Sequence, residues 1–394
     1  MDTPNTCLFM DPIQHLNLPV PFHRNAFSQS FVTVLPAGDG TLPSSSKPFI
    51  AHDQSFLSIL TPDARVRCLA RNEAGESFAH EAGVWVESLK EVWFTSNLIC
   101  HAPKSPDRDV RIVNIPSVQA GNGACPYGDH ILFCDQGGDI DHPSQLVIVN
   151  PRDPQDAQIL INNFFGRQFN SLNDVITLSS PKQRISPSEN RNQKPSLRET
   201  ISRGHTLWFT DPTYGFEQSF RPEPQLPSHV YVLDPHTGRI RVAADGFDHP
   251  NGIAFSPDGS TCYITDTSHI NGTGALNPHL QSTIYAFDVV WLGGATEAGG
   301  PSLQNRRVFA FADTGVPDGI KCDLEGNVYA GCGDGIHVWN AYGALIGRIL
   351  LGASDNNSGA GCANFCFIPG GRLVCFSEDR IYMVEGLAAQ GALL

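Results

Sequence analysis

Short runs of apolar and β-branched residues, separated by Gly, Pro, Asn and Asp, recur along the chain from about residue 50 onward. The clearest are GVWVESLKEVWFTS (83–96), SQLVIVNP (144–151), HTLWFTDP (205–212), GIAFSPDGSTCYITD (252–266) and GIKCDLEGNVYAGCGDGIHVWN (319–340). Several consist of a strand, a turn such as SPDG or DLEG, and a second strand, which is the pattern of β-hairpins. No long stretch has the 3.6-residue periodicity of an amphipathic helix. The pattern predicts an all-β chain with little helix.

A polar residue recurs where some of these strands begin. Asn173, Asn251 and Asp318 each precede an apolar run, and intervals of 78 and 67 residues separate them. Because four-stranded propeller blades span roughly 40–50 residues, these units would be blades enlarged by loops. Innermost strands line the central channel of a propeller, so residues at their starts converge on the axis. The repeat predicts a β-propeller with polar side chains gathered at one end of its channel.

The same pattern divides the chain. We expect residues 51–394 to form a single propeller domain and residues 1–50 to be an N-terminal extension that packs on it or caps it. Residues 181–203 are rich in Arg, Lys, Ser and Pro and have few apolar positions, which predicts a polar surface loop inserted in one hairpin. A lid over the channel is the alternative for this segment.

The charge and composition of the chain limit the classes of partner and the environment that we expect. The net charge of −14 disfavours binding to nucleic acid, because the phosphate backbone is repelled. None of the 11 cysteines forms a CxxC pair, and Cys262, Cys322 and Cys375 lie in apolar runs, which predicts buried free thiols. No run of about 18 apolar residues predicts a membrane span. No leader pattern is visible at the N-terminus, so we expect a cytoplasmic monomer or homodimer; a trimmed leader would instead imply secretion.

Four oxygen-bearing side chains are the candidate metal ligands. Glu81, Asn173, Asn251 and Asp318 offer two carboxylates and two amide oxygens. Such hard ligands suit Ca²⁺, or Mg²⁺ or Mn²⁺, and do not suit zinc. The chain has no HExxH, GxSxG, Walker or Rossmann motif.

Several motifs together resemble those of a known family. They are His80-Glu-Ala-Gly-Val-Trp85, Phe164-Phe-Gly-Arg-Gln-Phe-Asn-Ser-Leu-Asn-Asp-Val175, Leu207-Trp-Phe-Thr-Asp-Pro212, Pro250-Asn-Gly252, Pro317-Asp-Gly319 and Tyr329-Ala-Gly-Cys-Gly-Asp-Gly-Ile-His-Val-Trp-Asn340. Over roughly residues 75–385 the chain resembles the SMP-30/gluconolactonase/LRE-like family, and most closely the fungal calcium-dependent lactonohydrolases.

The resemblance implies a six-bladed β-propeller with one divalent metal, usually Ca²⁺, low in its channel. Glu81, Asn251 and Asp318 match the family's metal ligands, and Asn173 matches an asparagine that ligates the metal or touches substrate. Arg167 and Asp135 lie in or beside stretches that correspond to the family's, and they are candidate substrate contacts.

Two stretches depart from the fungal pattern. The sequence has Ile320-Lys321 where those relatives tend to have Val-His, and Asp135-Gln-Gly-Gly138 where they have Glu-Gly-Gln-Gly. Lys321 could donate to a substrate carbonyl, or it could point away from the metal. Both departures favour a substrate other than a simple sugar lactone.

Lactone hydrolysis is therefore the leading hypothesis. The metal would polarise the lactone carbonyl while Asp318 orients or activates water, with His80 as a weaker candidate base or as a support for Glu81. The alternative is a non-hydrolytic enzyme of natural-product biosynthesis, performing cyclisation, condensation or cycloaddition on a polyketide-like or terpenoid-like metabolite in the same channel. A propeller that only binds proteins is less favoured, because it has no need of four converging oxygen ligands.

Overall fold

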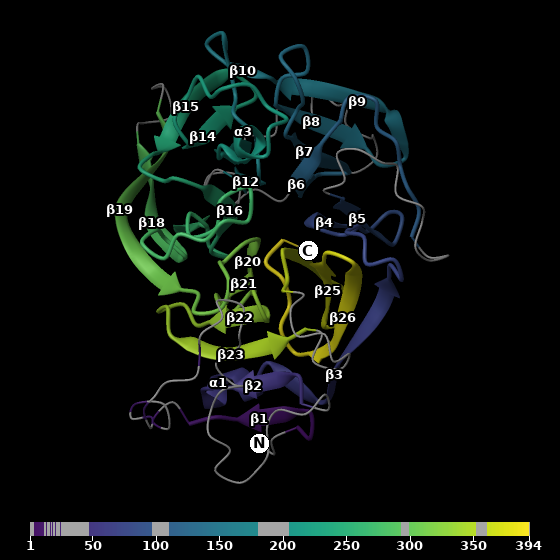
Figure 1. Ribbon diagram of the computed structural model, residues 1–394, viewed down its shortest axis with the longest axis vertical. Coiled ribbons are helices and arrows are strands. Elements are labelled where there is room, and N and C mark those ends of the chain that lie inside the picture. Colours follow the sequence, from purple (N-terminus) through teal and green to yellow (C-terminus); the bar gives the residue numbers. More distant parts are fainter. Residues whose placement is uncertain are drawn as a thin grey trace, which may run out of the picture.

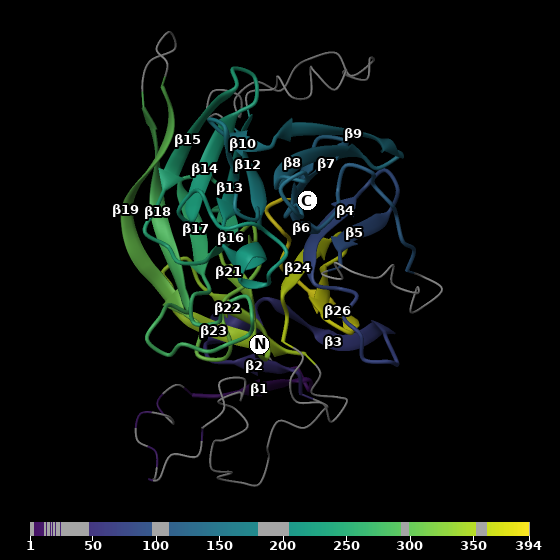
Figure 2. The same ribbon diagram turned by 45° about the horizontal axis from the view of Figure 1, so that its top comes forward.

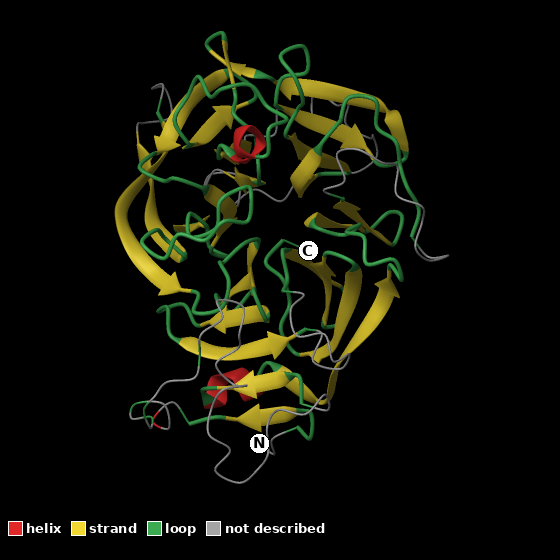
Figure 3. Cartoon of the chain, in the orientation of Figure 1, coloured by secondary structure: helices red, strands yellow, loops and turns green. Residues whose placement is uncertain are grey.

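The fold consists almost entirely of β-strands. In the computed structural model, the described residues are 4–11, 13, 16, 18, 20, 24, 47–96, 110–179, 205–292, 299–351 and 361–393. Within them, α-helix is limited to two four-residue pieces, α1 (Gln54–Leu57) and α3 (Tyr214–Glu217), drawn red in Figure 3. None of the described helices is long and apolar enough to cross a membrane. The prediction of an all-β chain is confirmed.

The strands form sheets that stand around a central axis (Figure 1). They include five blades of four antiparallel strands, which are placed from the axis outward in each blade. Four of these blades are sheets of their own, and the other is the inner part of a six-stranded sheet. The first is β6 (Gly121–Tyr127), β7 (His130–Asp135), β8 (Gln145–Asn150) and β9 (Asp153–Ile161). The second is β12 (Val175–Ser179), β13 (His205–Asp211), β14 (His229–Asp234) and β15 (Arg239–Ala244). The third is β16 (Pro250–Phe255), β17 (Thr261–Asp266), β18 (Thr283–Leu292) and β19 (Gly300–Phe311). The fourth is β20 (Ile320–Cys322), β21 (Val328–Cys332), β22 (Gly335–Trp339) and β23 (Leu345–Leu350).

The fifth blade joins distant parts of the chain. It consists of β24 (Asn364–Ile368), β25 (Arg372–Ser377), β26 (Arg380–Leu387) and, at its outer edge, β3 (Leu60–Arg71). In the antiparallel register of β26 and β3, Val384 lies opposite Val66. This pairing closes the ring, because the first long strand of the chain completes its last blade.

A two-stranded sheet, β4 (Glu81–Val86) and β5 (Glu91–Thr95), stands between the fifth blade and the first. Its inner strand β4 contacts β24 on one side and β6 on the other. The residues that follow, 97–109, lie outside the described part of the chain. The propeller prediction is therefore confirmed, whereas six complete blades are not.

The N-terminal segment adds to the outside of the fourth blade. Strand β1 (Cys7–Phe9) pairs parallel to β2 (Phe49–Ala51), and β2 pairs antiparallel to β23. Figures 1 and 2 show both strands outside the ring of blades. The division at residue 50 stays a prediction. The predicted loop insertion at 181–203 lies outside the described residues.

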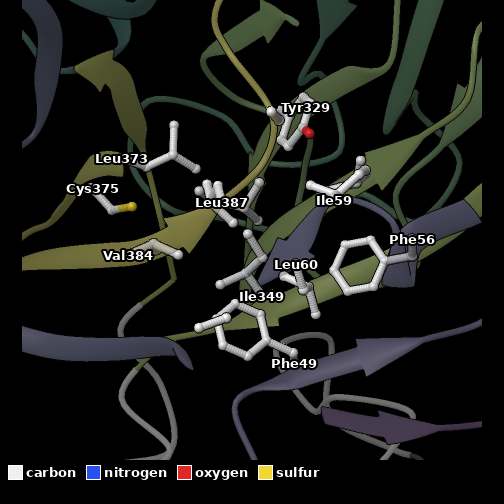
Figure 4. Close-up of a cluster of buried hydrophobic side chains, with 14 of the residues drawn as sticks. Phe49, Phe56, Ile59, Leu60, Tyr329, Ile349, Leu373, Cys375, Val384 and Leu387 are labelled. Atoms are coloured by element: carbon white, nitrogen blue, oxygen red, sulfur yellow. The ribbon is translucent and has the colours of Figure 1, made fainter. Parts of the chain in front are cut away.

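Hydrophobic cores fill the spaces between blades. The core shown in Figure 4 joins β2, α1 and β23 to the neighbouring β25 and β26, with Phe49, Phe56, Ile349, Leu373 and Val384 fully buried. The predicted buried thiols are confirmed, since Cys262, Cys322 and Cys375 are buried and free. These cores hold the inner strands in fixed positions around the channel.

Candidate functional site

The six inner strands begin at the same end of the channel, and each begins with polar residues, which together define the polar end. These residues are Glu81 of β4, Asn122 of β6, Asn173 just before β12, Asn251 of β16, Asp318 just before β20 and Asn364 of β24. All are buried except Asp318, which is partly exposed. The sequence pattern of a polar residue at the start of a strand was noted for Asn173, Asn251 and Asp318. The structure shows the same position for Glu81, Asn122 and Asn364.

Three of these strands have a bulge at the same place. The register shifts between Ala82 and Val84 in β4, between Gly121 and Ala124 in β6, and between Pro250 and Ile253 in β16. A bulge breaks the strict alternation of side chains and re-aims the residues beside it. The strands therefore depart from regular geometry where their polar residues stand.

Glycines let neighbouring inner strands approach closely at this level. A Cβ added at Gly252 would lie 2.5 Å from the carbonyl oxygen of Asp318, and one at Gly319 would lie 2.3 Å from Cγ of Asn364. Asn-Gly and Asp-Gly pairs are common in turns, but here Gly252 lies within β16. The glycines after Asn251 and Asp318 are therefore required by packing between neighbouring inner strands.

Two carboxylates are crowded at the polar end. Burial raises the pKa of Asp318 well above its usual range, and the charge of Glu81 raises it further. Burial also raises the pKa of Glu81, although the charge of His80 and a hydrogen bond from Asn364 act in the opposite direction. Such a pair of buried carboxyl groups is costly to ionise without a compensating cation.

His80 supplies part of that compensation. Burial alone would lower its pKa, but a hydrogen bond to Glu378 and the charges of Glu378 and Glu81 raise it to about 10. Its Nε2 lies 3.9 Å from Oε1 of Glu81. At neutral pH the ring is therefore an imidazolium beside Glu81, and its predicted role as a base stays a prediction.

Asn364 is a site residue that the sequence reasoning missed. Its Nδ2 donates to Oε2 of Glu81 at 2.7 Å, and its Oδ1 accepts from Nζ of Lys321 at 3.3 Å. It is 1% exposed. The signal that could have found it is its position at the start of an apolar strand, the same rule that singled out Asn251.

Tyr214, Glu217 and His249 are further residues that the sequence reasoning did not identify. Tyr214, on α3 inside the ring (Figure 3), stacks on His249 with ring centroids 4.8 Å apart and hydrogen-bonds Thr267 and Asn251. Glu217 accepts a hydrogen bond from Nε2 of His249, at 2.7 Å, if that nitrogen is protonated. These contacts fix Asn251 and the loop before it.

Arg221 ties together the loops at this end. Its buried guanidinium donates to backbone carbonyls within residues 138–142 and 169–170, and to the side chain of Gln168. One side chain thus holds the β7–β8 loop and the segment before β12 in fixed positions.

The other predicted site residues lie apart from this group. Asp135 ends β7, and its carboxylate accepts from the backbone N–H groups of Ala120 and Gly137 and from the side chain of Gln145. Arg167 is exposed on β11 (Arg167–Gln168), which pairs with β10 (Asn163–Phe164). Their roles in substrate binding stay predictions.

The oxygens at the polar end have unmet hydrogen-bonding capacity. Oδ1 of Asn173, Oδ1 of Asp318 and Oδ1 of Asn122 are buried and have no hydrogen-bond partner among the described residues. Within that part of the chain, no group of three or more His, Cys, Asp or Glu residues is placed to hold a metal ion. The candidate set differs from such a group, because half of it is amide. Unpartnered oxygens in a site with two carboxylates fit a hard cation.

Comparison with known proteins tests the family resemblance that the sequence motifs predict. Residues 199–370 match the family model described as the SMP-30/gluconolactonase/LRE-like region. The predicted family resemblance is confirmed.

Two lactonohydrolases of Aspergillus oryzae, oryH and oryL, are similar to this chain as well. They are 28% and 26% identical to it over 325 and 301 residues, covering 68% and 70% of this chain. The chain spans 66% and 61% of their lengths.

Solved structures of similar proteins bear on the fold alone. A gluconolactonase from Xanthomonas campestris has a TM-score of 0.58 at 23% identity, covering 86% of this chain and 94% of its own. A calcium-binding protein, regucalcin, from Agrobacterium tumefaciens has a TM-score of 0.52 at 16% identity, covering 82% of this chain and 95% of its own. Both likenesses agree with the propeller described above.

Proposed function

We propose that the polar end of the channel is the active site of a metal-dependent hydrolase that opens a lactone ring. The observation that carries this proposal is the group of buried oxygens at the inner-strand starts, among which Oδ1 of Asn173 and Oδ1 of Asp318 have no described protein partner. The family region and the names of the lactonohydrolase relatives support the reaction class.

Glu81, Asn173, Asn251 and Asp318 would hold the metal ion. Two carboxylates and two amide oxygens suit Ca²⁺, with Mg²⁺ and Mn²⁺ as alternatives. Regucalcin, a structural relative, is a calcium-binding protein. When bound, such an ion supplies Lewis-acid polarisation of the lactone carbonyl.

The surrounding side chains orient these ligands. Asn364 and the His80 imidazolium fix the carboxylate of Glu81, and Tyr214 holds the amide of Asn251 through a hydrogen bond. Partners of this kind set the direction in which a ligand oxygen points. Asp318, which is partly exposed to the channel, orients the attacking water by accepting one of its hydrogen bonds.

The β4–β5 sheet is the inner pair of a sixth blade in this proposal. Strand β4 fills the remaining place in the ring of inner strands and carries Glu81 to the axis. No observation on the described residues favours the non-hydrolytic alternative, so hydrolysis is the only function proposed.

A lactone panel tests the proposal. With an aldonolactone, pantolactone and an aliphatic lactone as substrates, we expect turnover that a chelator abolishes and added Ca²⁺ restores. Glu81→Gln and Asp318→Ala should each lower kcat/KM by about 100-fold or more, the size of effect seen when a key electrostatic group is removed.

Asp288→Asn is the matched control, because Asp288 is an exposed carboxylate on β18 that pairs with Arg307. It should leave turnover unchanged. Full turnover in chelator, or by Glu81→Gln and Asp318→Ala together, would refute the mechanism. Bound metal with no hydrolysis of any lactone would favour the non-hydrolytic alternative.

A further inference from the structure

A cavity of about 640 Å³ occupies the channel beyond the polar end. All six inner strands line it, so it lies on the axis of the ring; the lining side chains include Val84, Cys125, Val175, Ile253, Lys321 and Cys366. This volume falls within the range of sites that hold small organic ligands. We call this part of the channel the apolar end.

The apolar end is separate from the polar end. None of Glu81, Asn173, Asn251 and Asp318 lines the cavity. Between the two, Gly252 lies close to the backbone carbonyl of Asp318, and Gly319 lies close to the side chain of Asn364. Lys321 connects the two levels, since it lines the cavity while its Nζ donates to Asn364.

The cavity is lined mainly by uncharged side chains. Most of its inner wall is aliphatic, and the thiols of Cys125, Cys322 and Cys366 are neutral, because burial raises the pKa of each, to about 12 for Cys366. Lys321 is the only lysine or arginine among the lining residues of the described chain.

The acidic residues of the lining lie at the mouth. Glu87 and Asp129 are exposed, in the turns that follow β4 and β6. The ammonium of Lys321 therefore lies where the aliphatic wall meets the polar end, and its Nζ donates to Oδ1 of Asn364 at 3.3 Å. Burial raises the pKa of the carboxyl groups of Asp174 and Glu81, and the positive charge of Lys321 opposes this shift in both.

The segment after β26 closes part of this mouth. The backbone N–H of Ala392 donates to the carbonyl of Cys322, and the carbonyl of Gln390 accepts from Leu324. Figure 1 shows the C-terminus near the centre of the ring. The cavity is therefore a pocket with a defined wall on this side.

We propose that the apolar end is a binding site for a small monocarboxylic acid with an apolar chain. The carboxylate binds the ammonium of Lys321 through charge-assisted hydrogen bonds, and the chain packs against Val84, Val175 and Ile253. The lining of this site includes none of the four residues that would hold a metal, although Lys321 also donates to Asn364 at the polar end.

Titration with decanoate, by calorimetry and by ligand-observed NMR on the full chain, tests the site. We expect saturable binding of one decanoate per chain, at least tenfold tighter than the binding of decan-1-ol. Lys321→Met should weaken decanoate binding at least tenfold and leave decan-1-ol binding unchanged, whereas Lys321→Arg should retain decanoate binding.

Lys47→Met is the control, since Lys47 precedes β2 on the outside of the ring. Its decanoate affinity should equal that of the unmodified chain. Absence of saturable binding, or equal affinity of Lys321→Met and the unmodified chain, would overturn the proposal. If Lys321→Met does not fold, equal affinity of the unmodified chain for decanoate and decan-1-ol would overturn it. Binding is measured without lactone, so neither result depends on lactonase activity.

Discussion

The two ends of the channel are built from the same six strands and differ in chemistry. At the polar end, Glu81, Asn251 and Asn364 stand where β4, β16 and β24 begin. Two or three residues further along the same strands, Val84, Ile253 and Cys366 line the apolar end. A shift of about 7–10 Å along each strand thus changes the lining from buried oxygens to aliphatic groups.

The difference shows what each end needs. Buried carboxylates and amides are costly unless something satisfies them, so the polar end keeps its oxygens only with support from Asn364, His80 and Tyr214. The apolar end needs no such network, because its wall is mostly aliphatic. Its one lining lysine, Lys321, is enough to orient a bound carboxylate in the proposed site.

The largest effect on stability is expected from the hydrophobic core that supports the inner strand β24. Phe365 follows Asn364 in β24 and, with no exposed surface, packs in the core between the fourth and fifth blades. Phe365→Ala should lower the free energy of unfolding by about 3–5 kcal/mol, because the lost ring leaves a cavity in that core. Denaturant titration measures this loss.

The matched test is catalysis by the folded fraction of Phe365→Ala. Its lactonase kcat/KM should be nearly unchanged, since the ring faces the core and its neighbour faces the channel. A stable but inactive Phe365→Ala would show that Phe365 and not Asn364 faces the channel.

Asn364→Ala gives the next largest effect, and it acts on both ends of the channel. It removes the donor to Glu81 and the acceptor of Lys321. Loss of a partner that orients a metal ligand costs about 10–100-fold in metal affinity, so Ca²⁺ binding by calorimetry should weaken by that factor. The lactonase kcat/KM should fall with it.

Asn340→Ala separates this positioning role from a purely structural one. Asn340 accepts from two backbone N–H groups in the turn between β22 and β23, far from the strand starts. Its loss should reduce stability and leave Ca²⁺ affinity unchanged. Unchanged Ca²⁺ affinity in Asn364→Ala would remove Asn364 from the site.

Local patterns in the sequence were enough to predict the strands and the polar strand starts. Hairpins with SPDG and DLEG turns lie where predicted, between β16 and β17 and between β20 and β21. Asn251 and Asp318 could be singled out because each stands before an apolar run and is followed by glycine. These features depend on residues that are neighbours in the sequence, so they can be predicted without knowledge of contacts between distant parts of the chain.

Other features depend on contacts between distant residues. Nothing in residues 60–71 indicates pairing with β26, which lies more than 300 residues later in the chain. Asn364 was missed because it lies between Cys362 and Cys366, whose spacing is the more conspicuous pattern in that stretch. Tyr214 and His249 lie in loop or helix positions, where the strand pattern gives no signal, and they meet only after blades two and three pack together.

The smallest effect, taken per pH unit, concerns a carboxylate that supports the polar end. Asp211 ends β13 and accepts from the backbone N–H groups of Asn170 and Ser171, just before Asn173. Burial raises its pKa to about 7, so between pH 4 and pH 7 the folded chain binds a proton that the unfolded chain has lost. The stability that this group contributes is fully present below pH 4 and falls by at most about 1.4 kcal/mol per pH unit up to pH 7.

Denaturant titrations of the unmodified chain and Asp211→Asn at several pH values should differ by this slope, because an amide does not titrate. Parallel pH profiles would show that Asp211 is ionised in the folded chain, as its two hydrogen bonds alone would favour.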